Sequence, residues 1–84
     1  MSGDRIGIHE LGVLRAAVEG VSLGTYLGST IEIDHWREAL IERGLIAENC
    51  RATAGGYALA AELHLSDQPK CRAYLWPIAT EAGR

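Results

Sequence analysis

The chain has little cysteine and no long apolar run, and both absences narrow its setting. Cys50 and Cys71 are too few for a disulfide framework, so a reducing compartment would keep them as thiols. No apolar run approaches the roughly 18 residues that a membrane-spanning helix needs. The first residues lack the charged and apolar regions of a secretory signal. We therefore expect a cytoplasmic protein with no membrane partner.

Basic residues are also scarce. Eight Lys and Arg stand against eleven Asp and Glu, for a net charge of −3. This balance argues against a histone-like nucleic-acid binder, because phosphate contacts are made chiefly by Lys and Arg. A hydrophobic fraction of 48% is too high for a disordered tail. The 84 residues are too few for two cores, so we expect one domain over residues 1–84, with a marginal stability that a partner or a homodimer would raise.

Motifs for catalysis and for metal binding are missing as well. No Ser, Cys or Thr nucleophile stands in a recognisable motif, no Gly-rich phosphate loop follows a strand, and the three histidines are scattered. Cys50, His64 and Cys71 are residue types that suit zinc, but their spacing lacks a close C-x-x-C or H-x-x-x-H pair. We therefore expect no enzyme activity, no cofactor and no metal site.

A first helix is predicted near the N-terminus. Between residues 8 and 19, apolar side chains recur at three- and four-residue steps and so share one helix face. They are Leu11, Leu14, Ala17 and Val18. Gly20 should end this helix, and residues 21–28 predict a short further helix or a turn.

A capping box predicts the start of the next helix. Residues 29–32, Ser-Thr-Ile-Glu, have the spacing at which the hydroxyl and the glutamate satisfy backbone N–H groups. The apolar residues that follow at helical spacing are Ile33, Trp36 and Leu40. This spacing places Trp36 in the core. Gly44 stands where a left-handed C-cap is expected, and residues 45–46 should then open an extended connection as buried residues.

The pattern changes in the second half. Apolar residues alternate over residues 57–65, with the period of a half-buried strand. Residues 66–70 have turn composition, and residues 71–78 offer a second extended run, so a β-hairpin is predicted. Residues 59–66 are also good helix sequence and would suit the first half of a helix-turn-helix. We favour the hairpin, because Pro69 falls where the second helix should be well under way.

Two short stretches carry a family resemblance. Glu-Arg-Gly-Leu-Ile at residues 42–46 looks like the end of a recognition helix entering a wing, and Ala-Thr-Glu-Ala-Gly-Arg at residues 79–84 is similar to the segment that follows a wing. The chain thus resembles a winged helix-turn-helix domain of MarR-like bacterial regulators. The resemblance implies an α+β fold with N-terminal helices before a β-hairpin wing. It also implies a recognition helix over about residues 30–43 that enters the major groove.

The resemblance implies two groups of DNA contacts. His35 and Arg37 lie on the recognition helix, whereas Arg51, Lys70 and Arg72 lie in or before the wing, where cations hold phosphates. The charges conflict with this assignment. The recognition helix carries four acids against two arginines, and residues 1–48 have a net charge of −4 while residues 49–84 have +1. A phosphate backbone would repel such a helix.

Two functions therefore stay open. The resemblance favours a small DNA-binding transcriptional regulator that binds duplex DNA as a dimer. The charges favour an acidic protein-binding accessory or inhibitor module, of the kind that a phage or other mobile element would carry, which binds a basic protein surface and no DNA. Its contact residues would be Glu38 and Glu42 on the helix, with Tyr74 and Trp76 on an exposed strand face beside Arg72.

Overall fold

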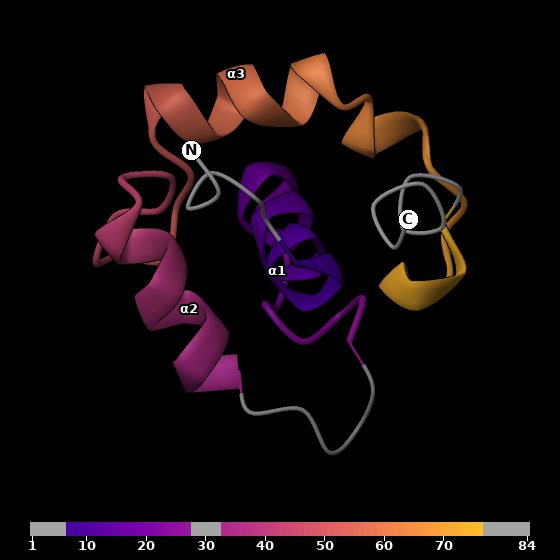
Figure 1. Ribbon diagram of the computed structural model, residues 1–84, viewed down its shortest axis with the longest axis horizontal. Coiled ribbons are helices and arrows are strands. Elements are labelled where there is room, and N and C mark those ends of the chain that lie inside the picture. Colours follow the sequence, from indigo (N-terminus) through magenta and orange to yellow (C-terminus); the bar gives the residue numbers. More distant parts are fainter. Residues whose placement is uncertain (1–6, 28–32, 77–84) are drawn as a thin grey trace.

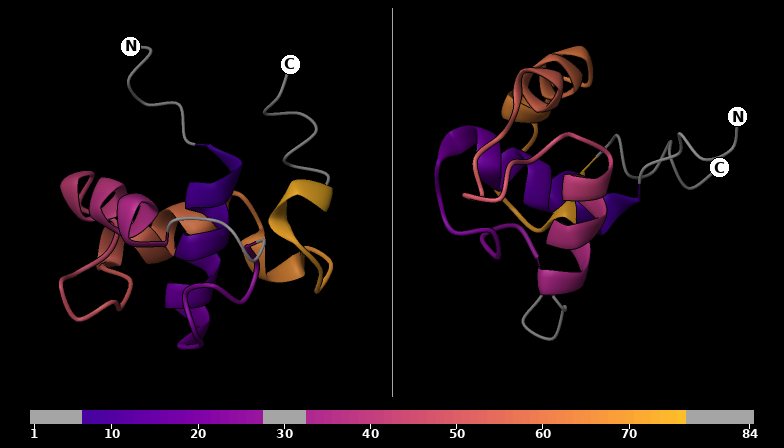
Figure 2. Two further views of the ribbon diagram at one scale, coloured as in Figure 1. Left: turned by 90° about the horizontal axis from the view of Figure 1, so that it is seen from below. Right: turned by 90° about the vertical axis from the view of Figure 1, so that its left-hand side faces the viewer.

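The computed structural model describes residues 7–27 and 33–76, which place four helical segments around a central helix. In chain order the elements are α1 (Ile8–Glu19), α2 (Ile33–Glu42), α3 (Ala54–Glu62) and two short 3-10 helices, η2 (Leu65–Asp67) and η3 (Ala73–Leu75). Figure 1 shows α1 in the middle of the ring that the other elements form, and Figure 2 shows it between α2 and η3.

The central position of α1 explains its burial. Residues 11–17 are all buried, although the sequence pattern predicts only one apolar face, because neighbours surround this helix on several sides. The predicted bounds are confirmed. Gly20 ends the helix at φ 76°, and its N–H donates to the carbonyl of Ala17. The buried apolar residues outside α1 are Tyr26, Leu27, Leu40, Ile46, Ala60, Leu65, Ala73 and Trp76.

The second predicted helix is also confirmed where the structure describes it. α2 covers residues 33–42, while the capping box at residues 29–32 lies outside the described residues. Gly44 has φ 76°, as a left-handed C-cap requires. Ile46 is buried and bridges to Ala52 in an extended connection. Trp36 is half-buried against the core, with its ring stacked on His9 at a centroid separation of 5.3 Å.

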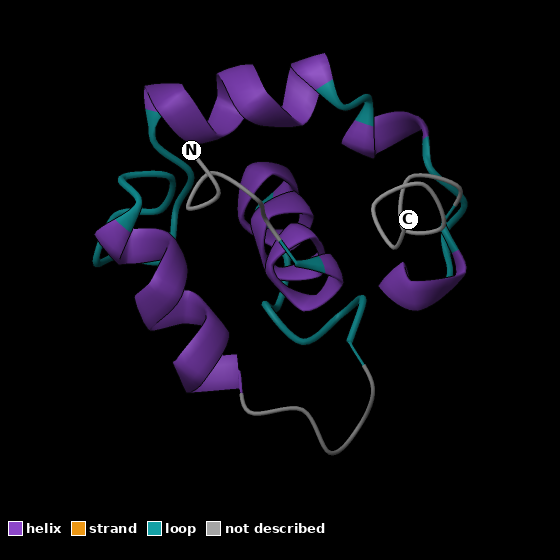
Figure 3. Ribbon diagram, viewed as in Figure 1, coloured by secondary structure: helices purple, strands orange, loops and turns teal. Residues whose placement is uncertain are grey.

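The predicted β-hairpin wing, and with it the α+β class, is wrong. Residues 7–27 and 33–76 contain no strand (Figure 3), and the bridge at Ile46 is isolated. The first predicted strand, residues 57–65, overlaps helix α3. The second, residues 71–78, contains the short helix η3, and residues beyond Trp76 lie outside the described part. The competing helix over residues 59–66 is correct only in part, because α3 begins earlier and ends at Glu62.

Helix capping and composition decide the conformation of α3. Thr53 accepts a hydrogen bond at its side chain from the N–H of Gly56, 3.1 Å away, which caps the helix. Alanine and leucine then supply high helix propensity. The predicted strand, in contrast, required Ala58 and Ala60 to be solvent-facing positions, for which alanine is no strong signal. The buried pair Gly56 and Ala60 has the four-residue spacing of a helix face. The helix propensity of α3 and the burial of one face of it therefore favour the same conformation.

The neighbouring glycines of α3 provide a matched test of this packing. A Cβ added to Gly56 would lie 2.1 Å from the Leu45 carbonyl oxygen, whereas at Gly55 the nearest atom would be 3.6 Å away. We expect Gly56→Ala to destabilise the protein by about 1–3 kcal/mol, because the helix must shift away from a backbone atom. Gly55→Ala should be neutral or stabilise by up to about 1 kcal/mol through helix propensity. Urea unfolding of both variants measures the difference, and equal effects would contradict the close contact.

Candidate functional site

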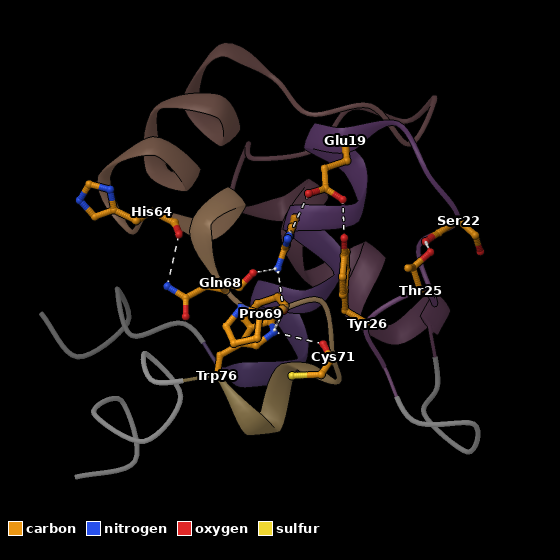
Figure 4. Close-up of polar contacts among 10 residues, drawn as sticks. Glu19, Ser22, Thr25, Tyr26, His64, Gln68, Pro69, Cys71 and Trp76 are labelled. Carbon is orange, nitrogen blue, oxygen red and sulfur yellow. Dashed lines mark hydrogen bonds and ion pairs between the residues drawn. The ribbon is translucent and has the colours of Figure 1, made fainter.

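A buried arginine holds the segment that precedes η3. Arg15 lies in the middle of α1 and has no exposed surface. Its Nη1 donates to two main-chain carbonyls, those of Gln68 at 3.1 Å and Pro69 at 3.2 Å. Figure 4 shows Gln68 and Pro69 near Trp76. Since a buried guanidinium must be compensated by hydrogen bonds, these contacts fix the path of residues 68–69 across α1.

Arg15 also organises the side chains around it. Its Nε donates to the Oε2 of Glu19, one helical turn later, at 2.9 Å. The guanidinium carbon lies 4.4 Å from the centroid of the Tyr26 ring and 5.2 Å from that of Trp76. Such cation–π contacts are strongest where water is excluded. The charge of Arg15 is therefore paired with a carboxylate, and its guanidinium is covered by two aromatic rings.

Glu19 and Tyr26 share a hydrogen bond in which the phenol donates to the Oε1 of the carboxylate (Figure 4). Burial raises the pKa of Glu19, but the hydrogen bonds from Tyr26 and Arg15, with the charges of Arg15 and Lys70, bring that pKa below its ordinary value of 4.5. Burial and the bond to Glu19 raise the pKa of Tyr26. Glu19 is thus held as a carboxylate and Tyr26 as a neutral donor.

The Trp76 indole holds the same segment from the other end. Its Nε1 donates to the carbonyls of Pro69 at 3.0 Å and Cys71 at 3.1 Å, and its side chain is fully buried. The main-chain N–H of Ala73 donates to the carbonyl of Tyr26 at 2.8 Å, which joins the segment to the turns that follow α1. Residues 68–73 are therefore anchored by buried donors.

A surface pocket of about 390 Å³ is lined in part by this anchored segment. Its lining consists of Thr25, Tyr26, Lys70, Cys71, Arg72 and Leu75. Neither Lys70 nor Arg72 forms an ion pair with another residue of the described ranges. We call this feature the cationic pocket, since the described part of its lining holds two cations and no acid. Such a pocket attracts an anionic group.

The predicted DNA contacts are divided between two sides of α1. Lys70 and Arg72 meet in the cationic pocket, whereas His35 and Arg37 lie on α2, across α1 from η3 (Figure 2). Arg37 is engaged by acids, at 4.0 Å from Asp34 and 3.3 Å from Glu38. These four predicted contacts therefore do not form one surface. The fifth, Arg51, is exposed in the connection of residues 43–53 between α2 and α3.

The predicted protein contacts are separated in a similar way. Glu38 and Glu42 are exposed on α2, and Tyr74 is 62% exposed on η3. Trp76 is fully buried, so the expected exposed face of Arg72, Tyr74 and Trp76 is wrong. The reason is local: alternate residues share a face in a strand, but η3 is a 3-10 helix that turns Tyr74 outward while Trp76 enters the core.

The sequence reasoning missed the residues that support the pocket. Arg15, Glu19, Tyr26 and Thr25 were not candidates, and Cys71 was considered only for zinc. A signal for Arg15 is nonetheless present, because it stands four residues after Leu11 on the apolar face and four before a glutamate. A charged residue on an apolar face, with an opposite charge one turn away, indicates a buried ion pair. Nothing in the sequence indicates Thr25 as a pocket residue.

Comparisons with known proteins assign no function to the cationic pocket. Within the described ranges, no helix is long and apolar enough to cross a membrane, and no three His, Cys, Asp or Glu side chains gather where they could hold a metal ion. The β-hairpin implied by the family resemblance is absent from these same ranges. Searches against protein-family models, curated proteins and solved structures found no match to this chain.

Proposed function

We propose that this protein is a binding module that holds an anionic group of a partner protein in the cationic pocket. The observation that carries this proposal is that Lys70 and Arg72 line one pocket without an ion-pair partner in the described ranges. A cationic side chain that is already paired with a protein carboxylate gains little free energy from binding an anionic ligand. An unpaired one gains a charge-assisted hydrogen bond. We assign no chemical step to the module.

The apolar surroundings support a protein as the partner. Leu75 lines the pocket and is 58% exposed, and the neighbouring Tyr74 is 62% exposed. A cationic pocket flanked by exposed apolar side chains suits an acidic residue that is followed or preceded by an apolar one. The proposal keeps the protein-binding class favoured by the charges of the sequence, but the partner surface at this site is acidic and not basic.

Duplex DNA is the competing ligand, since phosphodiesters are anions too. A DNA reader needs several cations on one surface, and the described candidates lie on both sides of α1. Two pocket cations would give a log–log salt slope of only about −2, because each phosphate contact contributes about −0.9. α2 also exposes Asp34, Glu38 and Glu42, which a phosphate backbone repels.

The test compares a fluorescein-labelled acidic peptide of alternating Glu and Leu with a 20-base-pair duplex by anisotropy, at low and moderate salt. We expect the peptide to bind the protein and the double variant Lys70→Gln, Arg72→Gln to lose at least about tenfold in affinity, which is about 1.4 kcal/mol. Arg51→Gln removes an exposed cation outside the pocket and serves as the control. Peptide binding that is unchanged in the double variant, or duplex binding with a salt slope of −6 or steeper, would overturn the proposal.

A further inference from the structure

The charge of the cationic pocket sets the charge of its ligand. Among the described residues its lining carries two cations and no acid, so a ligand with two negative charges would match both of them. The charge of Lys70 helps to lower the pKa of Glu19. Both oxygens of that carboxylate, however, already accept hydrogen bonds from Arg15 and Tyr26. A carboxylate ligand would match only one of the two cations, whereas a phosphate monoester carries about −1.5 to −2 charges at pH 7.

The backbone presents both cations to one ligand. Lys70 and Arg72 both line the pocket, and so does Cys71 between them, so this short segment brings two cations to one site. Arg15 and Trp76 fix the carbonyls of residues 68, 69 and 71 on the inner side of this segment. Lys70 and Arg72 therefore lie on a backbone segment whose position is fixed before a ligand binds, which lowers the entropy cost of binding.

The two side chains have complementary chemistry for phosphate. A planar guanidinium such as that of Arg72 can donate two parallel hydrogen bonds to a phosphate, and a compact ammonium such as that of Lys70 can donate to a third oxygen. Leu75 supplies an apolar wall beside them. A pocket of about 390 Å³ is large enough for a phosphorylated side chain and is at the lower end of the range for small-ligand sites.

We infer that the anionic group held by Lys70 and Arg72 is a phosphate monoester, carried by a phosphorylated side chain of the partner protein. This inference rests on the proposed function and narrows it from any anionic group to a dianionic one. Binding forms no covalent bond: the phosphate oxygens accept hydrogen bonds from the two cationic side chains, and the apolar residue next to the phosphorylated one contacts Leu75.

Three peptides that differ at one position test the inference. They carry phosphoserine, glutamate or serine next to a leucine, and isothermal titration calorimetry at pH 7.5 measures their binding to the whole chain. We expect phosphoserine to bind at least about tenfold more tightly than glutamate, and serine to show no measurable binding. Lys70→Gln and Arg72→Gln should each remove most of the phosphoserine preference, while Arg51→Gln should retain it. Circular dichroism of each variant verifies that the fold is kept.

The outcomes separate the inference from the function on which it rests. Equal binding of the phosphoserine and glutamate peptides, lost together in the two pocket variants, would overturn the phosphate inference and leave anionic-group binding intact. Binding of neither peptide above the serine peptide would overturn both. Inorganic phosphate serves as a competitor. If free phosphate matched the phosphopeptide in affinity, the phosphate group would be recognised without its peptide, which would overturn the assignment to a partner protein.

Discussion

Replacing Arg15 by alanine is expected to destabilise the protein by about 3–5 kcal/mol, the range found when one partner of a buried charge pair is removed. The variant leaves the carbonyls of Gln68 and Pro69 without their buried donor, and it leaves Glu19 without its cation. It also empties space beneath two aromatic rings. An 84-residue domain has a total stability of about 4–13 kcal/mol, so this loss would remove a large share of that free energy of unfolding.

Urea unfolding followed by far-ultraviolet circular dichroism measures this effect. Arg51→Ala is the matched control, since it removes an exposed arginine and should change stability by no more than about 0.5 kcal/mol. Arg15→Met keeps much of the buried volume and loses only the donors and the charge, so it should fall between the two. An Arg15→Ala variant as stable as Arg51→Ala would show that Arg15 does not hold the segment over α1.

The second large effect is expected at Trp76. Trp76→Ala should cost about 3–5 kcal/mol, because it removes the largest fully buried side chain of the described residues. Its Nε1 also donates to the carbonyls of Pro69 and Cys71, and its ring packs edge-on against Tyr26 at a centroid separation of 5.5 Å. The cost therefore combines a cavity with the loss of a buried donor.

Two comparison variants separate these contributions. Trp76→Phe keeps an aromatic ring and loses the donor, so it should destabilise by about 1–3 kcal/mol. Trp36→Ala removes the other tryptophan, which is only half-buried, and should cost less than Trp76→Ala. Thermal unfolding of all three variants gives the order. If Trp36→Ala proved the more damaging, the core would be centred on α2 and not beneath η3.

Much of the helical content could be predicted because its signals are local. The apolar period of α1 and the glycine after it are contained within thirteen residues, and the left-handed Gly44 follows directly from the end of α2. The candidate cations were also found from sequence, as Lys70 and Arg72 are close together in the chain. Lys70 was expected in a turn and Arg72 in the extended run after it, whereas the structure brings both into the lining of one pocket.

Other features depend on contacts that no local pattern encodes. The cap of α3 at Thr53 is a local signal, but the close approach of Gly56 to Leu45 is a tertiary contact. The burial of Trp76 depended on a 3-10 turn that directs it into the core. Alternation over residues 57–65 is compatible with either conformation, because alanine fills two of the four positions that a strand would turn to solvent.

The sequence by itself determined where α1 and α2 end, the acidic excess of the first half, and the pair of cations at Lys70 and Arg72. Only the tertiary structure decided that this pair shares a pocket with Thr25 and that Arg15 is fully buried. The reason is distance along the chain. Arg15 is compensated by carbonyls 53 and 54 residues away, and such contacts exist only once residues 68–76 have folded back across the central helix.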